Sequence, residues 1–324
     1  MLILVKNGLF VAIVAQSLIG ISLVWDKVLL ERRETQNIFA YVFWLGAMSV
    51  LGLLLMPFGF RVPSLALALL AFGTGVLHLI SVFFYYVALK RGEASQALAI
   101  MGGFSPVATA LIALPLLPTS LGSKSLLGFS LLTGGGFVMF MTERFNLRRI
   151  FLPVLLASGS FGLVNVLQKL VFDQTNFVTG YVIFTFGTFV GALLLLVRRS
   201  WRGQIFGSSQ GAEPRSRFWY FVNRVISGVG SFLVFYAISL ANPAIVDSIS
   251  GVRYALIFIG AYLLTRLKPE WLRENFTGWV LIGKAIATAL IVAGLVQLGL
   301  GGSGSEGAGP AVIVARAMQA RRQP

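Results

Sequence analysis

The sequence contains no cysteine, a single histidine and only 11 Asp and Glu among its 324 residues. Without cysteine the chain forms no disulfide and no cysteine-based metal or redox site. The few acidic residues mostly flank apolar stretches, and no His-rich motif or Ser/His/Asp arrangement is present. That leaves too little for metal binding or acid/base catalysis. We therefore expect a protein that is not an enzyme and that holds no metal or cofactor.

Charge of either sign is also scarce. Charged residues make up 11% of the chain, whereas a soluble domain has about 25%, and hydrophobic residues make up 57% with a mean hydropathy of +0.86. The longest connection between apolar stretches runs from about 198 to 217, which is too short for a soluble domain. The composition predicts one integral membrane domain.

Ten strongly apolar stretches are spaced almost evenly along the chain. A helix needs roughly 20 apolar residues to cross a hydrocarbon core about 30 Å thick. The predicted fold is therefore all-α and integral to the membrane, with ten transmembrane helices at 8–27, 38–58, 64–89, 93–115, 126–142, 150–172, 177–197, 218–240, 243–266 and 276–300.

The ten stretches divide into two sets of five. An odd number of spans per half means that the second half enters the membrane inverted, as in many secondary transporters. Weak internal similarity supports this division: a shift of 150 residues places Tyr86 over Tyr236, and a shift of 142 places Gly20 over Gly162. We predict repeats at 1–146 and 147–300, followed by a flexible basic tail at 301–324.

A net charge of +15 suggests nucleic acid at first, but the positions of the charges argue against it. More than half of the basic residues lie in the odd-to-even connections, which is the positive-inside pattern. This predicts a cell (inner) membrane protein whose termini both lie outside the cytoplasm. The basic residues in the odd-to-even connections are Arg32, Arg33, Lys90, Arg91, Arg144, Arg148, Arg149, Arg198, Arg199, Arg202, Arg215, Arg217, Arg266, Lys268 and Arg273.

Four segments resemble the drug/metabolite transporter superfamily, EamA type. GISLVWDK and its counterpart GLVNVLQK match the opening pattern of each half, with Gly followed seven residues later by Lys. FFYYVALKRGEASQALAIMGGFSPVATALIA and FYAISLANPAIVDSISGVRYALIFIGAYLL resemble the junctions of spans three and four and of spans eight and nine. The likeness covers about 8–300 and implies ten helices in two inverted repeats that move small solutes without ATP hydrolysis.

The chain also departs from this family. Members commonly carry an acidic residue just after the fourth span, where this sequence reads LPLLPTSLGSK. Many members keep their termini in the cytoplasm, whereas the charge pattern here predicts the opposite. The resemblance therefore implies no particular substrate.

Ionisable residues within the apolar stretches are costly and are functional candidates by default. Arg253 lies near mid-depth of the ninth stretch, where it is either an anion ligand or a structural charge. Asp247, six residues earlier, faces about 120° away from Arg253, so direct pairing is not expected. It is either a proton-coupling carboxylate or a helix cap near the surface. Lys284, in the tenth stretch, is either a substrate ligand or a structural lysine.

Structural roles are also open to the other polar residues in the apolar stretches. Arg224 is expected to reach the membrane interface, and Lys27 and Lys169 to be solvated anchors at the ends of their spans. His78, the sole histidine, is either a proton relay or a hydrogen-bonded histidine of the bundle. The surplus of embedded positive charge favours an anionic or zwitterionic solute over a lipophilic cation.

Aromatic side chains and helix breaks complete the candidate site. Tyr86, Tyr236 and Tyr254 are expected to line the solute cavity. Two interruptions, GGFSP in the fourth stretch and SGVRY in the ninth, are either gating hinges with unwound backbone that lines a cavity, or ordinary Gly and Pro tolerated in membrane helices. The predicted hinge residues are Gly102, Gly103, Pro106 and Gly251.

The sequence thus favours a secondary transporter, in the export direction, for a small polar or anionic metabolite, working by alternating access between the repeats. The expected partners are a small-molecule solute and the lipid bilayer, without nucleic acid, and a homodimer is left open. The alternatives are a flippase for a lipid-linked headgroup and an exporter of amphipathic drugs.

Overall fold

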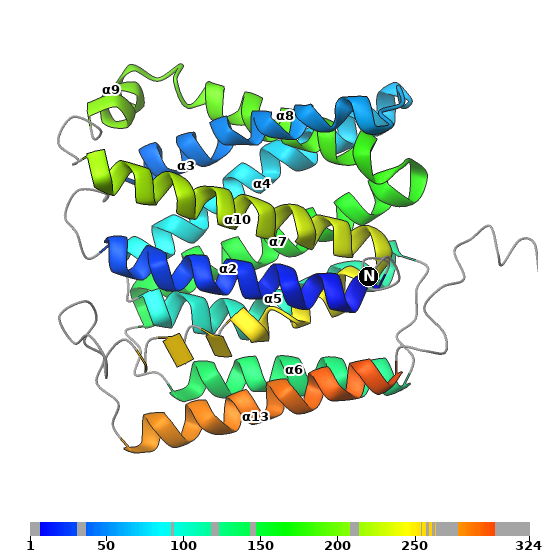
Figure 1. The fold of residues 1–324 in the computed structure, drawn as a ribbon, viewed down its shortest axis with the longest axis vertical. Helices are drawn as coiled ribbons and strands as arrows, with labels where there is room; N and C mark the ends of the chain where they lie inside the picture. The colour runs from blue at the N-terminus through cyan, green and yellow to red at the C-terminus, as the bar shows by residue number, and fades with distance from the viewer. Residues whose placement is uncertain are drawn as a thin grey trace, which may run out of the picture.

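A computed structural model of the chain describes residues 7–30, 37–91, 94–117, 123–142, 147–207, 214–253, 255–256, 259–260, 263 and 278–301. These residues are helical or lie in short turns and connections, and none of them is in a strand. The predicted tail therefore lies outside the described residues, except for Gly301. The helices lie side by side and alternate in direction (Figure 1).

The helix bounds follow the apolar stretches of the sequence. They are α2 (Gly8–Leu30), α3 (Ile38–Met48) continued by the 3₁₀ segment η2 (Ser49–Phe58), α4 (Leu65–Arg91), α5 (Ala94–Leu116), α6 (Ser123–Thr142), α7 (Leu147–Gln174), α8 (Phe177–Leu194), α9 (Arg199–Gly207), α10 (Pro214–Leu240), α11 (Pro243–Ser248) and α13 (Gly278–Gly301). Among the residues that the structure describes, six helices are long and apolar enough to cross a membrane by length and composition. They lie at Gly8–Trp25, Ile38–Phe58, Leu65–Arg91, Ile150–Gln174, Phe177–Leu194 and Phe221–Leu240. The predicted count of ten spans stays a prediction.

Asparagine side chains cap four of the described helices, beginning with Asn7, which accepts hydrogen bonds from the first turn of α2. Asn37 accepts hydrogen bonds from the backbone N–H groups of Phe39 and Ala40, and Asn176 accepts one from Thr179. Asn242 caps α11, whose first residue is proline. Each cap satisfies N–H groups that have no partner within the helix. The chain therefore fixes these helix starts with its own side chains.

Glycine allows one helix pair to cross at backbone contact. A Cβ on Gly75 of α4 would lie 2.0 Å from the carbonyl oxygen of Phe184, and a Cβ on Gly187 of α8 would lie 2.1 Å from that of Phe72. The Thr188 hydroxyl also donates to the Gly75 carbonyl at 3.0 Å. Small residues at helix contacts are typical of membrane proteins, so α4 and α8 are held together by their backbones.

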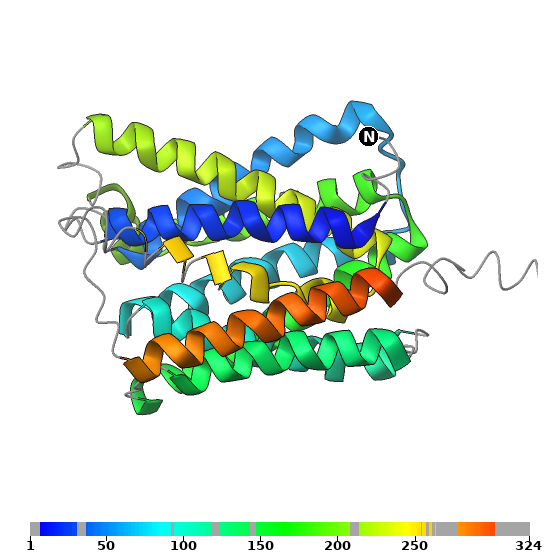
Figure 2. The same ribbon diagram turned by 60° about the horizontal axis from the view of Figure 1, so that its bottom comes forward.

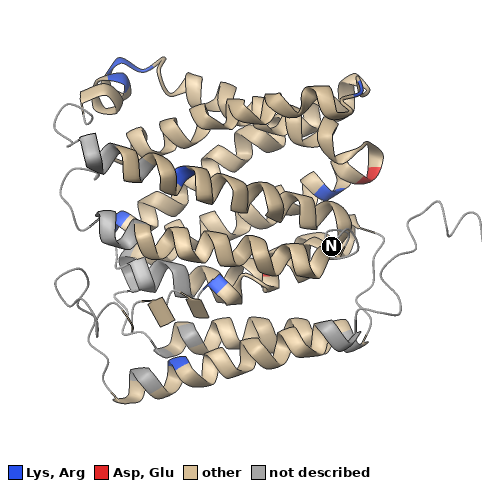
Figure 3. Ribbon diagram, viewed as in Figure 1, with Lys and Arg blue, Asp and Glu red and all other residues tan. Residues whose placement is uncertain are grey.

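The remaining helices pack around this pair. α2 lies along α10, α4 along α7, and α5 against α6, α7 and α11. α6 and α13 lie side by side at one edge of the bundle in both views (Figures 1 and 2). Lys, Arg, Asp and Glu are sparse along the described helices (Figure 3), so each charge within the bundle is a candidate for function.

Candidate functional site

Asp247 in α11 is bound by two hydroxyl groups of α5. Its Oδ2 accepts hydrogen bonds from Ser105 Oγ at 2.8 Å and from Thr109 Oγ1 at 2.6 Å. Both hydroxyls face α11 because they lie four residues apart, on one face of α5. Asp247 itself is partly exposed, and its second carboxylate oxygen has no hydrogen-bond partner in the described part of the chain. That oxygen remains available to a proton or a ligand.

Arg253 lies deeper in the ninth stretch and binds Gln16 of α2. Its Nε donates to Gln16 Oε1 at 3.1 Å, and one terminal nitrogen donates to the same oxygen. Gln16 is buried, and Gly20, one turn further along α2, lets the backbone of Arg253 approach closely. The other terminal nitrogen has no partner among the described residues. The Arg253 guanidinium is thus oriented by Gln16 with one donor group left over.

Asp247 and Arg253 do not form an ion pair with each other. Each is held by neutral side chains of a different helix, although the two charges interact electrostatically. This agrees with the 120° separation expected from their helical spacing. The site therefore presents two opposite charges, each with free bonding capacity.

The two predicted helix breaks differ. Ile249 and Ser250 form a turn after α11, and the backbone nearby makes i→i−3 bonds, among them Ser250 N to the Asp247 carbonyl and Arg253 N to the Ser250 carbonyl. The ninth stretch thus leaves α-helical geometry between its two charges. The Ser250 hydroxyl, in the middle, is buried without a partner.

α5 is continuous from Ala94 to Leu116, so the helix is not unwound at Gly102, Gly103 and Pro106, and their role as a hinge stays a prediction. Proline cannot donate to the carbonyl four residues earlier, here that of Gly102. Gly136 of α6 packs against this carbonyl so closely that a Cβ there would lie 2.5 Å from its oxygen. The Gly102 carbonyl, which receives no hydrogen bond from Pro106, thus packs against α6, and α5 stays helical.

Arg224 is buried between helices and does not extend into water, which corrects the snorkelling side chain expected from sequence. Its guanidinium donates to the Tyr86 hydroxyl at 3.1 Å and lies over the Tyr41 ring, 5.2 Å from the centroid. The two tyrosine rings are 4.8 Å apart. Arg224, Tyr86 and Tyr41, named here the Arg224 bridge, connect α10 to α4 and α3.

Three other predicted residues occupy separate surroundings. Lys284 of α13 is buried. Tyr236 packs its ring against Phe177, 5.1 Å away. His78 lies among the rings of Phe161, Phe184 and Phe235, and its Nδ1 is buried without a hydrogen-bond partner. Tyr254 lies outside the described residues.

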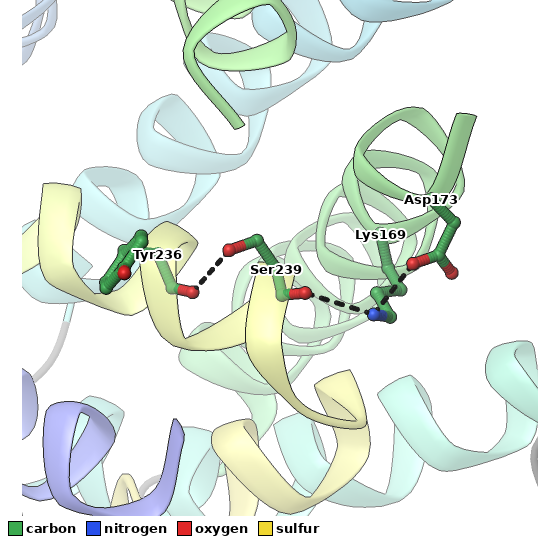
Figure 4. A network of polar contacts seen from close by, with 4 residues as sticks. All are labelled: Lys169, Asp173, Tyr236 and Ser239. Atoms are coloured by element: carbon green, nitrogen blue, oxygen red, sulfur yellow. Dashed lines mark hydrogen bonds and ion pairs between the residues drawn. The ribbon is translucent and has the colours of Figure 1, made fainter. Parts of the chain in front are cut away.

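Lys169 joins α7 to the end of α10 (Figure 4). Its Nζ donates to the Ser239 carbonyl at 3.3 Å and pairs with Asp173 Oδ1 at 2.8 Å, while the Ser239 hydroxyl donates to the Tyr236 carbonyl at 2.7 Å. The Lys169 side chain is only 13% exposed. It therefore binds the last carbonyl groups of a helix, a favourable place for a cation, and is not the solvated anchor expected from sequence. The side chain of Lys27 lies outside the description.

Sequence reasoning missed the neutral partners of both charges. Gln16, Ser105 and Thr109 carry no charge and sit in apolar stretches, so hydropathy does not single them out. Their distance along the chain also hides them, since Gln16 lies 237 residues from Arg253. No three His, Cys, Asp or Glu gather as metal ligands in the part of the chain that the structure describes.

Comparisons with known proteins bear on this arrangement. Residues 6–141 match the family model described as the EamA-like transporter family. A solved structure titled only "Crystal structure of protein" aligns with a TM-score of 0.60 and 17% identity, covering 91% of this chain and 96% of that one. At that identity the likeness shows a shared fold alone. No curated protein sequence matches the chain.

Proposed function

We propose a solute pathway and a gating mechanism for this membrane protein, whose residues 6–141 belong to the EamA-like transporter family, within the drug/metabolite transporter superfamily. The family gives the general role, which is transport of a small molecule across a lipid bilayer. The proposal is secondary export of a small polar or anionic metabolite by alternating access. One observation carries it: Arg253 and Asp247 are each held by neutral groups and each keep free bonding capacity inside the bundle.

Arg253 is the anion ligand in this proposal. A guanidinium stays charged at any physiological pH and binds carboxylate or phosphate strongly. Gln16 fixes its orientation without neutralising it, so an incoming anion meets an oriented cation that has no ion-pair partner among the described residues. Lys284 and the tyrosines Tyr86, Tyr236 and Tyr254 are assigned to the same pathway as predicted contacts.

Asp247 is the proton-coupling group in this proposal. Ser105 and Thr109 donate to one carboxylate oxygen, and the other oxygen is able to take up a proton without breaking these bonds. The turn between Asp247 and Arg253 allows this segment to change length when the proton binds. His78 remains a second, predicted proton carrier.

The packing of the helices is consistent with two inverted repeats. An inverted repeat relates the first five spans to the last five, so the contact of α4 with α7 is equivalent to that of α10 with α2, and both are extensive. α6 with α13, and α5 with α11, are contacts between equivalent spans, as expected near a two-fold axis. Alternating access would then be a rocking of one repeat against the other.

Ligand-dependent stability of the purified protein tests the solute class. Small organic anions, amino acids, nucleobases, sugars and lipophilic cations would be screened at low salt, since a ligand at 100 times its Kd adds about 2.7 kcal/mol. We expect anions to stabilise the wild type, Arg253→Lys to keep part of the effect, and Arg253→Ala to lose it. Gln16→Leu, which removes the orienting group only, should weaken binding less. Equal stabilisation of all four proteins by neutral or cationic solutes would contradict the anion proposal.

Transport by Asp247→Asn tests the coupling. The amide still accepts the Ser105 and Thr109 bonds, so the fold should be kept while the proton site is lost. In proteoliposomes we expect proton-gradient-driven transport to fall at least tenfold while exchange of solute for solute continues. Proportional loss of both activities would assign Asp247 to binding or structure instead.

A further inference from the structure

α9 lies in the longest connection of the chain and combines an apolar face with a basic one. Ile205 is fully buried in the same hydrophobic cluster as Tyr41 and Tyr86. Trp201 stacks on Phe39 of α3 with ring centroids 5.0 Å apart. The apolar side of α9 is thus packed onto α3, at the end of the bundle where α3 begins.

A hydrogen bond from a side chain to the backbone fixes α9 against the start of α3. The Asn37 side-chain amide donates to the Gln204 carbonyl at 3.1 Å, while its oxygen caps α3. One asparagine therefore sets both the start of a helix within a predicted span and the position of α9. Because α3 starts at the edge of the apolar layer, α9 lies at the height of the lipid headgroups.

Three exposed arginines lie in α9 or directly before it. Arg198, Arg199 and Arg202 are exposed, and Arg198 lies over the Trp201 ring at 5.1 Å. Arg199 and Arg202 make no hydrogen bond or ion pair with any residue that the structure describes. Aromatic rings at the apolar boundary with arginines above them are the arrangement that binds an acidic membrane surface.

We infer that α9 is a binding site for anionic phospholipids, with Arg199 and Arg202 contacting the headgroup phosphates. Anionic lipids are concentrated in the cytoplasmic leaflet, and the charge pattern of the sequence predicts the cytoplasm on this side. A bound lipid would hold α9, and with it the Tyr41 and Tyr86 cluster, against α3. This goes beyond the solute pathway, because the ligand is a membrane lipid bound outside the bundle.

Lipid titration of the intact, delipidated protein tests the site. Phosphatidylglycerol and phosphatidylcholine would be added separately, with binding followed by native mass spectrometry and by the shift in Tm. We expect phosphatidylglycerol to bind more tightly and to raise Tm, an effect reduced between about 50 mM and 500 mM salt. Arg199→Gln/Arg202→Gln should bind about thirtyfold more weakly, because each arginine near an acidic surface contributes about fivefold to binding.

Two comparisons make the outcome decisive. Lys90→Gln/Arg91→Gln removes two charges from the same end of the bundle and should bind phosphatidylglycerol as the wild type does. Equal loss in both double variants, or no preference for phosphatidylglycerol in the wild type, would overturn the inference. Inorganic phosphate that reproduces the Tm shift would also overturn it, because the site would then recognise a free anion and not a lipid. A wild-type protein that binds phosphatidylglycerol as expected but does not transport solute would contradict the proposed function and leave the lipid site supported.

Discussion

Two helix contacts in this protein differ in the atoms that form them. One joins α4 to α8, and the other joins α10 to α3 and α4. The first is backbone against backbone: Gly75 and Gly187 leave no room for even a methyl group. The second is made by the side chains of the Arg224 bridge. Under the proposed inverted repeat, α4 with α8 corresponds to α10 with α3. The comparison indicates which contact is fixed and which is able to open.

The Arg224 bridge lies at one end of the bundle. Tyr41 is three residues from the start of α3, and Tyr86 is five residues from the end of α4, within about 8 Å of the odd-to-even connections along the helix axes. We propose that the bridge closes this end in the conformation described here. Lys169 and Ser239 join α7 to α10 at the far end of α10.

Adding a methyl group to the backbone crossing should have the largest effect. Gly187→Ala places a Cβ against the Phe72 carbonyl, which cannot move without shifting α4, so we expect a loss of about 3 kcal/mol of stability. Thermal unfolding in detergent measures it. Gly73→Ala is the matched control, because a Cβ there meets nothing within 4 Å. A Gly187→Ala protein as stable as this control would show that the crossing is not fixed.

Removing the Arg224 bridge should open one end without unfolding the protein. Because the chain has no cysteine, a single Ser250→Cys reporter can be labelled without background, and it removes no hydrogen bond of the Ser250 hydroxyl. We expect Arg224→Ala to raise labelling by an impermeant thiol reagent about tenfold, equivalent to about 1.4 kcal/mol, from the side of the odd-to-even connections only. Tyr86→Phe, which removes one hydroxyl and keeps the ring, should give a smaller increase.

Arg198→Ala controls for loss of an arginine over an aromatic ring. Arg198 lies over Trp201 at nearly the same distance as Arg224 over Tyr41, but outside the bundle, so Ser250→Cys labelling should not change. An increase from both sides in Arg224→Ala would indicate general loosening. No increase would show that Arg224 does not close this end.

Replacing Lys169 should have the smallest effect. Lys169→Met removes one bond to the Ser239 carbonyl and a pair with Asp173, which is 40% exposed, so the loss should stay within about 1 kcal/mol. Labelling of Ser250→Cys should rise a few-fold, from the side opposite to that seen with Arg224→Ala. Asp173→Asn keeps the bond to Ser239 and should leave labelling unchanged. An equal increase in both variants would assign the effect to the ion pair.

Hydropathy predicts the positions of the helices along this chain closely, but it predicts poorly which side chains meet between helices. The stretches at 64–89 and 177–197 became Leu65–Arg91 and Phe177–Leu194, since apolar length alone fixes where a helix lies in a bilayer. Pro106 was left undecided and Arg224 was misjudged for the same reason. The surroundings of each are set by another helix, Gly136 of α6 for the first and the tyrosines of α3 and α4 for the second.

α9 packs against a helix from the other half of the sequence. α9 follows α8 and therefore belongs to the second half of the sequence, yet it is seated on α3 of the first half through Asn37, Phe39 and the cluster around Tyr41. If the chain were expressed as two fragments divided at 143–146, the first would lack the cover of α3. A division at 208–213 would leave that cover in place. Two co-expressed fragments should therefore reassemble better when the break follows α9 than when it follows the fifth span.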